Sequence, residues 1–335
     1  MKKTQTDILS LEDIPALGEI GIIKLNKEGI FTKTDLLCRY PLDVAEITGM
    51  DRDKAAKAFD YCRTLLEKAG MLVKREHTAK ELLEERKKIE HLQTGCKGLD
   101  AMLTGGIECR AITQLYGIAG SGKTQTGHTL CVQAQRPTEE GGLAGKHPAN
   151  VLYIDTEDTF RPERILSMCQ ARGYDAKQID KVLGGIIVQK AKDAGHQVVI
   201  IKNVSHVIHE LNVRLIVVDS GTALFRSEYL ERGNLSRKQQ HLNEMMHLLK
   251  NTAENHNLAV VLINQIYHRP DAFGNPEMAY GGNVVAHSST YIVNLAKSGR
   301  KYMATLEKSP MHPKDNCLYD ITPAGIVDYV DKKKE

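Results

Sequence analysis

A glycine-rich stretch between an apolar segment and a helical segment constrains this chain of 335 residues more than any other feature. Ala111 to Tyr116 are apolar and β-prone, and they lead directly into the pattern G-x-x-x-x-G-K-[ST]. Gln125 to Gln133 follow with a composition that continues a helix. Glycines leave backbone N–H groups free to approach a polyphosphate, and the helix dipole adds partial positive charge. The residues that this pattern predicts to bind a nucleoside triphosphate are Gly117, Ile118, Ala119, Gly120, Ser121, Gly122, Lys123 and Thr124, followed by the adjacent Gln125.

Four side chains are candidates for holding the phosphates, a metal ion and the attacking water. Lys123 is expected to reach the β- and γ-phosphates and to act in catalysis, and the Thr124 hydroxyl is expected to ligate Mg²⁺. The apolar run ending at Asp219 supplies a second acid for the metal's water shell, although an ordinary aspartate at a strand end would look the same. Glu157 follows another apolar run and is the best candidate for the base that activates water. The sequence therefore predicts ATP and Mg²⁺ as cofactors.

Apolar runs of strand length alternate with helical segments through the middle of the chain. This alternation is typical of a mostly parallel sheet covered by helices on both faces, so the predicted fold class is α/β. From Thr290 onward, short runs broken by Ser298-Gly299 and Pro310 predict antiparallel hairpins at the edge of that sheet. The expected strands comprise residues 111–116, 151–155, 186–189, 214–219 and 258–263, and the expected helices comprise residues 125–133, 161–172, 196–209 and 235–255.

The N-terminal part of the chain has a different, all-helical pattern. Leu11 to Leu25 carry apolar residues at helical spacing with Gly18 inside the run, and residues 41–66 have the pattern of two helices joined by a turn at Thr48 to Asp51. We expect Asp51 or a neighbour to cap the second helix. Such helix–glycine turn–helix units resemble DNA-binding helix-hairpin-helix modules, although a small helical protein–protein domain fits the same pattern. We therefore divide the chain into a helical unit (residues 1–70), a charged, partly helical connector (71–92) and an ATPase core (93–335).

Composition limits the class of protein further. With 45 basic and 42 acidic residues the net charge is +3, so any nucleic-acid contact must come from local basic patches. The seven cysteines form no C-x-x-C pair, which favours reduced thiols in a cytosolic protein. The N-terminal sequence MKKTQTDILS lacks the apolar region of a secretion signal, and the longest apolar runs are too short to span a bilayer. We expect a cytoplasmic, nucleoid-associated protein with no membrane partner.

The residues around Glu157 carry a more specific resemblance. Tyr153 to Glu157, followed by Thr159 to Arg164, is very similar to a signature of the RecA-superfamily recombinases, in the branch formed by archaeal RadA and its eukaryotic relatives. Similar residues continue in the same order at Asn264-Gln265, Gly281 to Asn283 and His287. The helical N-terminal unit is also typical of that branch, and the resemblance covers essentially the whole chain. It implies a RecA-like P-loop ATPase core.

The resemblance also implies roles for individual residues. Glu157 resembles the glutamate that activates water, and Arg164 resembles the residue that packs on adenine. Asn264 and Gln265 resemble the sensor that couples the γ-phosphate to a DNA-binding loop, so Gln265 is also an expected catalytic residue. His287 is similar to a histidine that reports nucleotide across the subunit interface. Without this correspondence to the family's motifs, single arginine, glutamine and histidine side chains usually serve only to make structural hydrogen bonds.

Two segments are expected to contact single-stranded and double-stranded DNA. Residues 226–239 are basic and polar, and residues 267–280 are rich in glycine, proline and aromatic residues. Cationic grooves follow phosphates, and aromatic side chains stack on bases without sequence preference. By composition alone, surface loops that bind nothing would fit equally well. The expected DNA-binding residues are Arg226, Tyr229, Arg232, Arg237, Lys238, Arg269 and Phe273.

Three positions depart from the family pattern, one of them being Met278 to Tyr280, where relatives favour a basic residue and proline. Relatives join neighbouring subunits through a Phe-x-x-Ala motif in the connector, and here Glu76 takes the place of the phenylalanine. Either Leu72 or Val73 takes the place of the phenylalanine in the pocket of the neighbouring subunit, or polymerisation is weaker. Archaeal relatives also carry an aspartate before the equivalent of Ser309-Pro310, where it holds a monovalent cation beside ATP. Here that position is Lys308, so we expect its ammonium to replace the cation and, with Pro310, to contact ATP in the adjacent subunit.

The resemblance implies a DNA-dependent ATPase that assembles as a homo-oligomer on single-stranded DNA and performs homologous pairing and strand exchange in recombination and repair. Recombination mediators are further expected partners. Two other functions fit parts of the sequence. A mediator paralogue, which binds ATP and DNA without exchanging strands, is favoured by Glu76. A ring-forming DNA-translocating helicase on the same core is opposed by the helical N-terminal unit and by Thr159 to Arg164.

Overall fold

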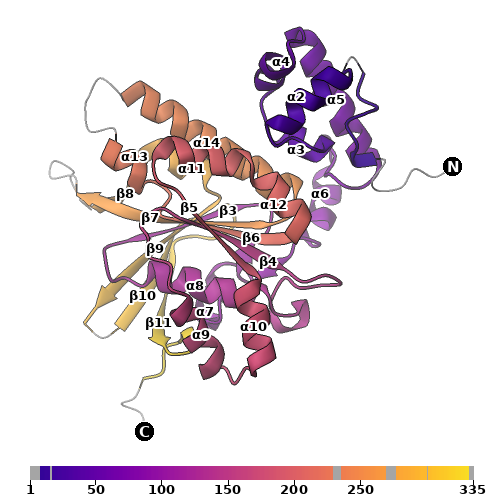
Figure 1. Cartoon of the computed structure of the whole chain (residues 1–335). Coiled ribbons are helices and arrows are strands. Elements are labelled where there is room, and N and C mark those ends of the chain that lie inside the picture. The colour runs from indigo at the N-terminus through magenta and orange to yellow at the C-terminus, as the bar shows by residue number, and fades with distance from the viewer. Residues whose placement is uncertain (1–7, 16, 229–234, 269–276, 300, 332–335) are drawn as a thin grey trace.

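The computed structural model describes residues 8–15, 17–228, 235–268, 277–299 and 301–331. A helical unit, coloured indigo to violet, lies against one side of a larger α/β core (Figure 1). Predictions that fall on the remaining residues lie outside the described part of the chain. Within the described part, no helix is both long and apolar enough to cross a membrane.

The core is built on a ten-stranded sheet. Nine strands lie in the order β12-β11-β10-β9-β3-β7-β6-β4-β5, and β8 pairs with the end of β7. The pairings from β9 to β5 are parallel, whereas β9 to β12 pair antiparallel, as the sequence predicts. The strands are β3 (Ile112–Gly117), β4 (Asn150–Asp155), β5 (Ile186–Lys190), β6 (Val213–Asp219), β7 (Ala259–His268), β8 (Glu277–Ala279), β9 (Tyr291–Ser298), β10 (Lys301–Lys308), β11 (Asp315–Thr322) and β12 (Gly325–Asp328).

Each face of the parallel strands carries its own apolar core. Successive side chains of a strand point to opposite faces, so Tyr153 and Val217 enter one core while Leu152 and Ile216 enter the other. Helices α7 to α10 cover the first face and α11 to α15 the second (Figure 1). The helices are α7 (Lys97–Met102), α8 (Lys123–Ala134), α9 (Pro162–Ala171), α10 (Ala176–Gly184), α11 (Ala194–Lys202), α12 (Val204–Leu211), α13 (Ala223–Glu228), α14 (Leu235–Asn255) and α15 (Gly282–Ser288).

The helical unit has a separate small core. Gly49 has a φ of +78° and ends one helix, and the Asp51 carboxylate accepts the Asp53 N–H at 2.8 Å to cap the next. The predicted helix–turn–helix with its aspartate cap is therefore confirmed over these residues. The helices are α2 (Glu19–Lys27), α3 (Lys33–Leu37), α4 (Pro41–Thr48) and α5 (Arg52–Lys68).

Three predicted helix boundaries were wrong. The helix expected from Leu11 begins only at Glu19, because Gly18 is extended (ψ 173°). The helix expected over residues 196–209 is two helices that meet at Asn203. The helix after the glycine loop begins at Lys123 rather than two residues later, because the helical turn starts as soon as the loop ends.

The connector (residues 71–92) includes one helix and one short strand. It contains α6 (Ala79–Arg86), which is capped reciprocally by Thr78 and Glu81. Its last two residues form β1 (His91–Leu92), which pairs with β2 (Ile107–Glu108) in a two-stranded sheet. The division of the chain at residue 93 stays a prediction.

Candidate active site

The glycine loop lies where β3 ends and α8 begins, next to the carboxyl ends of the parallel strands. A Cβ on Gly117 would lie 2.0 Å from the Leu295 carbonyl oxygen. Gly120 and Gly122 have φ values of +76° and +92°, which side-chain-bearing residues rarely adopt. The loop thus requires its glycines, and it places the start of α8 at the site as predicted.

Lys123 lies over the loop. Its ammonium donates to the carbonyl oxygens of Gly117 and Ile118, both at 2.8 Å. Burial lowers the pKa of Lys123, while the nearby charges of Asp219 and Glu157 raise it. The cation is therefore held by weak carbonyl acceptors, which phosphate oxygens can replace with stronger, charge-assisted bonds.

Thr124 and Asp219 meet at the floor of the site. The Thr124 hydroxyl donates to Asp219 Oδ2 at 2.8 Å, and the Tyr153 hydroxyl donates to the same oxygen at 2.7 Å. Burial raises the pKa of Asp219, and these two hydrogen bonds oppose the shift. A hydroxyl and a carboxylate are hard oxygen donors of the kind that Mg²⁺ prefers, so the donors present fit this ion.

Glu157 and Gln265 face each other across the site. Gln265 Nε2 donates to Glu157 Oε1 at 2.7 Å. The Asp155 carboxylate accepts the Glu157 N–H at 3.2 Å and so fixes the turn that follows β4. Together with the glycine loop, Lys123, Thr124 and Asp219, this pair lines a cavity of about 250 Å³. The residues predicted from separate strands to hold phosphate, metal and water are thus gathered around one cavity.

Asn264 and Gln265 lie within β7 rather than after its end, because the strand continues to His268. The Asn264 side chain accepts a hydrogen bond from Thr222 and donates to the Tyr280 carbonyl oxygen at 2.5 Å. Tyr280 in turn accepts a hydrogen bond from the Lys238 ammonium, which lies 4.5 Å from its ring centroid. A continuous set of contacts therefore runs from Gln265, the partner of Glu157, to the C-terminal ends of both segments expected to bind DNA.

Arg164 is fixed beside the first turn of α8. Its guanidinium donates to Gln125 Oε1 at 2.6 Å, to the Thr322 carbonyl at 2.7 Å and to the Pro323 carbonyl at 2.8 Å. The structure therefore brings together Arg164 and Gln125, which the sequence assigned separately to the nucleotide.

Lys308, His287 and Pro310 lie away from this cavity. The Lys308 ammonium donates to the carbonyl oxygens of Ala286 and Ser289 at 2.7 Å, and to that of His287 at 3.4 Å, at the end of α15. His287 and Pro310 are exposed. These three residues do not line the cavity of their own chain, so contact with ATP in an adjacent subunit stays a prediction.

The expected DNA-binding residues divide into three groups. Arg226 is exposed in α13 and Arg237 is exposed near the start of α14. Lys238 is only 9% exposed because it packs on Tyr280. Much of residues 226–239 is thus helical rather than loop. Tyr229, Arg232, Arg269 and Phe273 lie outside the described residues.

Sequence reasoning missed Tyr153, Thr222 and Tyr280 as parts of the site. Tyr153 lies within the quoted signature, and its neighbour in the parallel register is Val217, two residues before Asp219. A prediction of strand order and register would have placed its side chain near that carboxylate. Nothing in the local sequence connects Thr222 or Tyr280 with Asn264.

Comparisons with known proteins agree with this geometry. Residues 85–329 match the family model described as Rad51. A similar protein is the DNA repair and recombination protein RadA of the archaeon Cenarchaeum symbiosum (strain A), which is 41% identical over 327 residues, or 97% of this chain and 80% of the relative. The matched region includes the glycine loop, Glu157, Asp219 and the antiparallel sheet edge. This chain belongs to the Rad51 family.

Proposed function

We propose that this chain is a DNA-dependent ATPase that assembles on single-stranded DNA and carries out homologous pairing and strand exchange in DNA recombination and repair. The observation that carries the proposal is the Glu157–Gln265 hydrogen bond facing the glycine loop, with its continuation to Tyr280. It connects the position of the expected catalytic base to the segments expected to hold DNA. Family membership and the relative's printed name point to the same activity.

The chain's own residues hold the triphosphate. The loop N–H groups and Lys123 bind the phosphates, since both lie at the start of α8 where the helix dipole favours an anion. Thr124 and Asp219 would hold Mg²⁺, which when bound neutralises charge on the phosphate oxygens. Arg164 is partly exposed beside Gln125, and we propose that adenine packs on its guanidinium.

Glu157 accepts the proton of the attacking water. Gln265 occupies one carboxylate oxygen and so orients the other toward the cavity. Because Gln265 lies in β7 next to Asn264, a shift of the β7–β8 hairpin on DNA binding alters the position of Glu157. This arrangement explains how DNA can stimulate hydrolysis without touching ATP.

Assembly supplies the remaining contacts. Lys308 binds three carbonyl oxygens at the end of α15, as a monovalent cation would. We propose that Lys308, His287 and Pro310 meet ATP of a neighbouring subunit. Arg226 and Arg237 are exposed cations for the DNA backbone. We propose the cytoplasmic nucleoid as the site of action, consistent with seven unpaired cysteines.

One observation favours the alternative of a mediator that binds ATP and DNA without exchanging strands. Glu76 stands at the position of the tethering phenylalanine, and burying a carboxylate there costs free energy. A groove of about 580 Å³ nearby is lined mostly by charged side chains, together with Leu72, Val73 and His77, and it offers another docking surface. The intact set of Lys123, Glu157 and the other site residues opposes this alternative.

A joint assay of ATP hydrolysis and DNA strand exchange tests the proposal. Lys123→Ala is expected to lose ATP binding and both activities, whereas Glu157→Gln keeps ATP binding, loses hydrolysis and stays on DNA. Lys146→Ala, which removes an exposed lysine from a surface loop, is the matched control and keeps both activities. DNA-stimulated hydrolysis without any strand exchange in the wild type would instead establish the mediator.

A further inference from the structure

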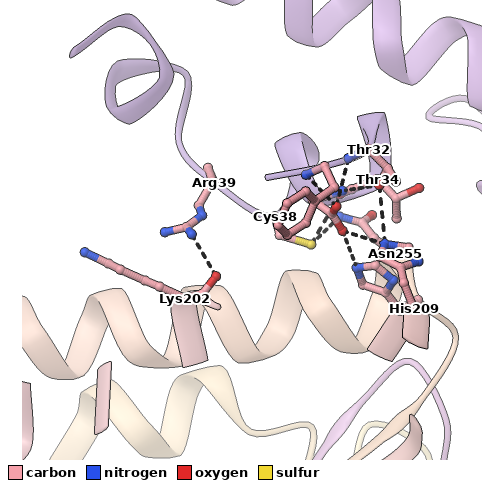
Figure 2. Close-up of polar contacts among 10 residues, drawn as sticks. Thr32, Thr34, Cys38, Arg39, Lys202, His209 and Asn255 are labelled. Carbon is pink, nitrogen blue, oxygen red and sulfur yellow. Dashed lines mark hydrogen bonds and ion pairs between the residues drawn. The ribbon is translucent and has the colours of Figure 1, made fainter. Parts of the chain in front are cut away.

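Three side chains from distant parts of the chain meet where the helical unit packs on the core. Asp35 comes from α3, His209 from α12, and His256 follows α14. His209 Nε2 lies 2.9 Å from Asp35 Oδ1, and His256 Nε2 lies 3.4 Å from the same oxygen. All three ligand atoms lie within 4.8 Å of one another. Figure 2 shows His209 beneath the residues of the helical unit.

Asp35 presents its Oδ1 oxygen to the two histidines. Its Oδ2 accepts the N–H groups of Phe31 and Thr32 at 3.0 and 2.9 Å, which fixes the carboxylate plane. Among the described residues, the cationic or imidazole side chains within ion-pair distance of this carboxylate are the two histidines.

His256 supplies an unused buried nitrogen. Its side chain is 4% exposed, and its Nε2 has no hydrogen-bond partner although it faces the Asp35 carboxylate. Leaving such a nitrogen unbonded costs free energy, and native structures rarely do so without a bound group.

We propose that Asp35, His209 and His256 form a binding site for a divalent transition-metal ion, with Zn²⁺ as the best fit, which joins the helical unit to the core. Two imidazole nitrogens and one carboxylate oxygen are a donor set that Zn²⁺ takes in a tetrahedral arrangement. The fourth position can be filled by water or by the Thr32 hydroxyl, whose oxygen lies 3.5 Å from His209 Nε2.

The neighbouring thiol is not part of this site. Cys38 donates to the Thr34 carbonyl at 3.4 Å, and burial raises its pKa to about 12, so it stays a protonated thiol (Figure 2). The expected ligation is therefore by nitrogen and oxygen only, which distinguishes this site from zinc bound adventitiously by cysteines.

Other contacts also join the two parts at this junction. Arg39 donates to the Lys202 carbonyl at 2.7 Å (Figure 2), Asn251 donates to the Cys38 carbonyl at 3.4 Å, and Tyr40 stacks on His247 with ring centroids 3.7 Å apart. A metal ion bound by both parts would add a strong, directional link. It would hold the helical unit in the orientation of Figure 1 relative to the core.

Zinc binding by the full chain, without a polyhistidine tag and without nucleotide, tests the proposal. Equilibrium dialysis against Zn²⁺ followed by metal analysis should find one ion per wild-type chain. Asp35→Asn and His256→Gln should each weaken binding by about 100-fold or more, because loss of a ligand exceeds the 10–100-fold cost of losing a supporting partner. His206→Gln is the matched control, since it removes the exposed histidine that pairs with Glu210 at 3.3 Å one turn earlier on α12.

His209→Gln keeps the test decisive if the buried variants do not fold. His209 is 34% exposed, so this substitution changes a ligand with little change in packing. Co²⁺ bound by the wild type should give tetrahedral absorption without a thiolate charge-transfer band, and His209→Gln should lose it. The proposal is overturned if the wild type binds no zinc, if His209→Gln keeps it, if His206→Gln loses it, or if a thiolate band appears.

Discussion

Gln265→Met is the substitution that probes the catalytic arrangement most directly. Methionine has a similar length but cannot donate a hydrogen bond, so Glu157 loses its 2.7 Å partner. A hydrogen bond to a charged group contributes about 1.5–3 kcal/mol. Glu157 is exposed, so we take the lower end, and about 1.4 kcal/mol corresponds to a tenfold change in rate. We therefore expect kcat for ATP hydrolysis to fall about tenfold.

The assay is steady-state ATP hydrolysis with and without single-stranded DNA. KM for ATP should change little, because Gln265 acts on Glu157 rather than on bound ATP. DNA stimulation should also weaken, because Gln265 connects Glu157 with the β7–β8 hairpin. In a Glu157→Gln background, whose own loss is about 10²–10⁴-fold, adding Gln265→Met should have no further effect.

That double variant also provides the result that would refute the reasoning. If Gln265→Met lowers kcat by the same factor whether or not Glu157 is present, the two residues act independently. A change in KM alone would show that Gln265 contributes to ATP binding instead of orienting the base.

Three further predictions concern the cation position, acid stability and assembly. The rate of ATP hydrolysis by the wild type should be nearly the same in KCl and NaCl at equal ionic strength, because the Lys308 ammonium already binds the carbonyl oxygens at the end of α15. Hydrolysis by Lys308→Asp should become dependent on K⁺. Strong stimulation of the wild type by KCl would contradict this prediction. Burial lowers the pKa of His128 from 6.5 to about 4, so between these pH values the unfolded chain binds a proton that the native chain does not, and the free energy of unfolding falls by up to about 3 kcal/mol as pH is lowered. His128→Leu should remove this loss when urea unfolding is compared at pH 7 and pH 4.5. An unchanged pH dependence in that variant would contradict the prediction. Glu76→Phe should lower the protein concentration needed for assembly about tenfold or more, because a buried phenylalanine contributes about 1.5–3 kcal/mol. If light scattering of this variant is unchanged from the wild type, residue 76 does not lie in the interface between subunits.

The core of the fold could be predicted from local sequence because its strands are buried on both faces. The run ending at Asp219 and the run ending at Asp155 are almost continuously apolar, so their type and length were evident. Helix ends were less predictable. Gly18 and Asn203 interrupt apolar periodicity that continues across them, and only their backbone geometry reveals the breaks.

The candidate site could be predicted in part because its residues lie at strand ends. In a parallel sheet these ends share one edge, which brings Lys123, Glu157 and Asp219 together. Contacts between distant residues carry no comparable signal. His209 and Asp35 are separated by 174 positions, and the Lys238–Tyr280 contact depends on how α14 packs on the β7–β8 hairpin.

Electron microscopy of the protein with long single-stranded DNA, Mg²⁺ and a non-hydrolysable ATP analogue tests the central claim most directly. The account predicts continuous helical filaments whose length follows that of the DNA, with Lys123→Ala forming none. Isolated particles or closed rings at saturating protein would contradict strand exchange through a filament and would favour a mediator or a ring-forming helicase.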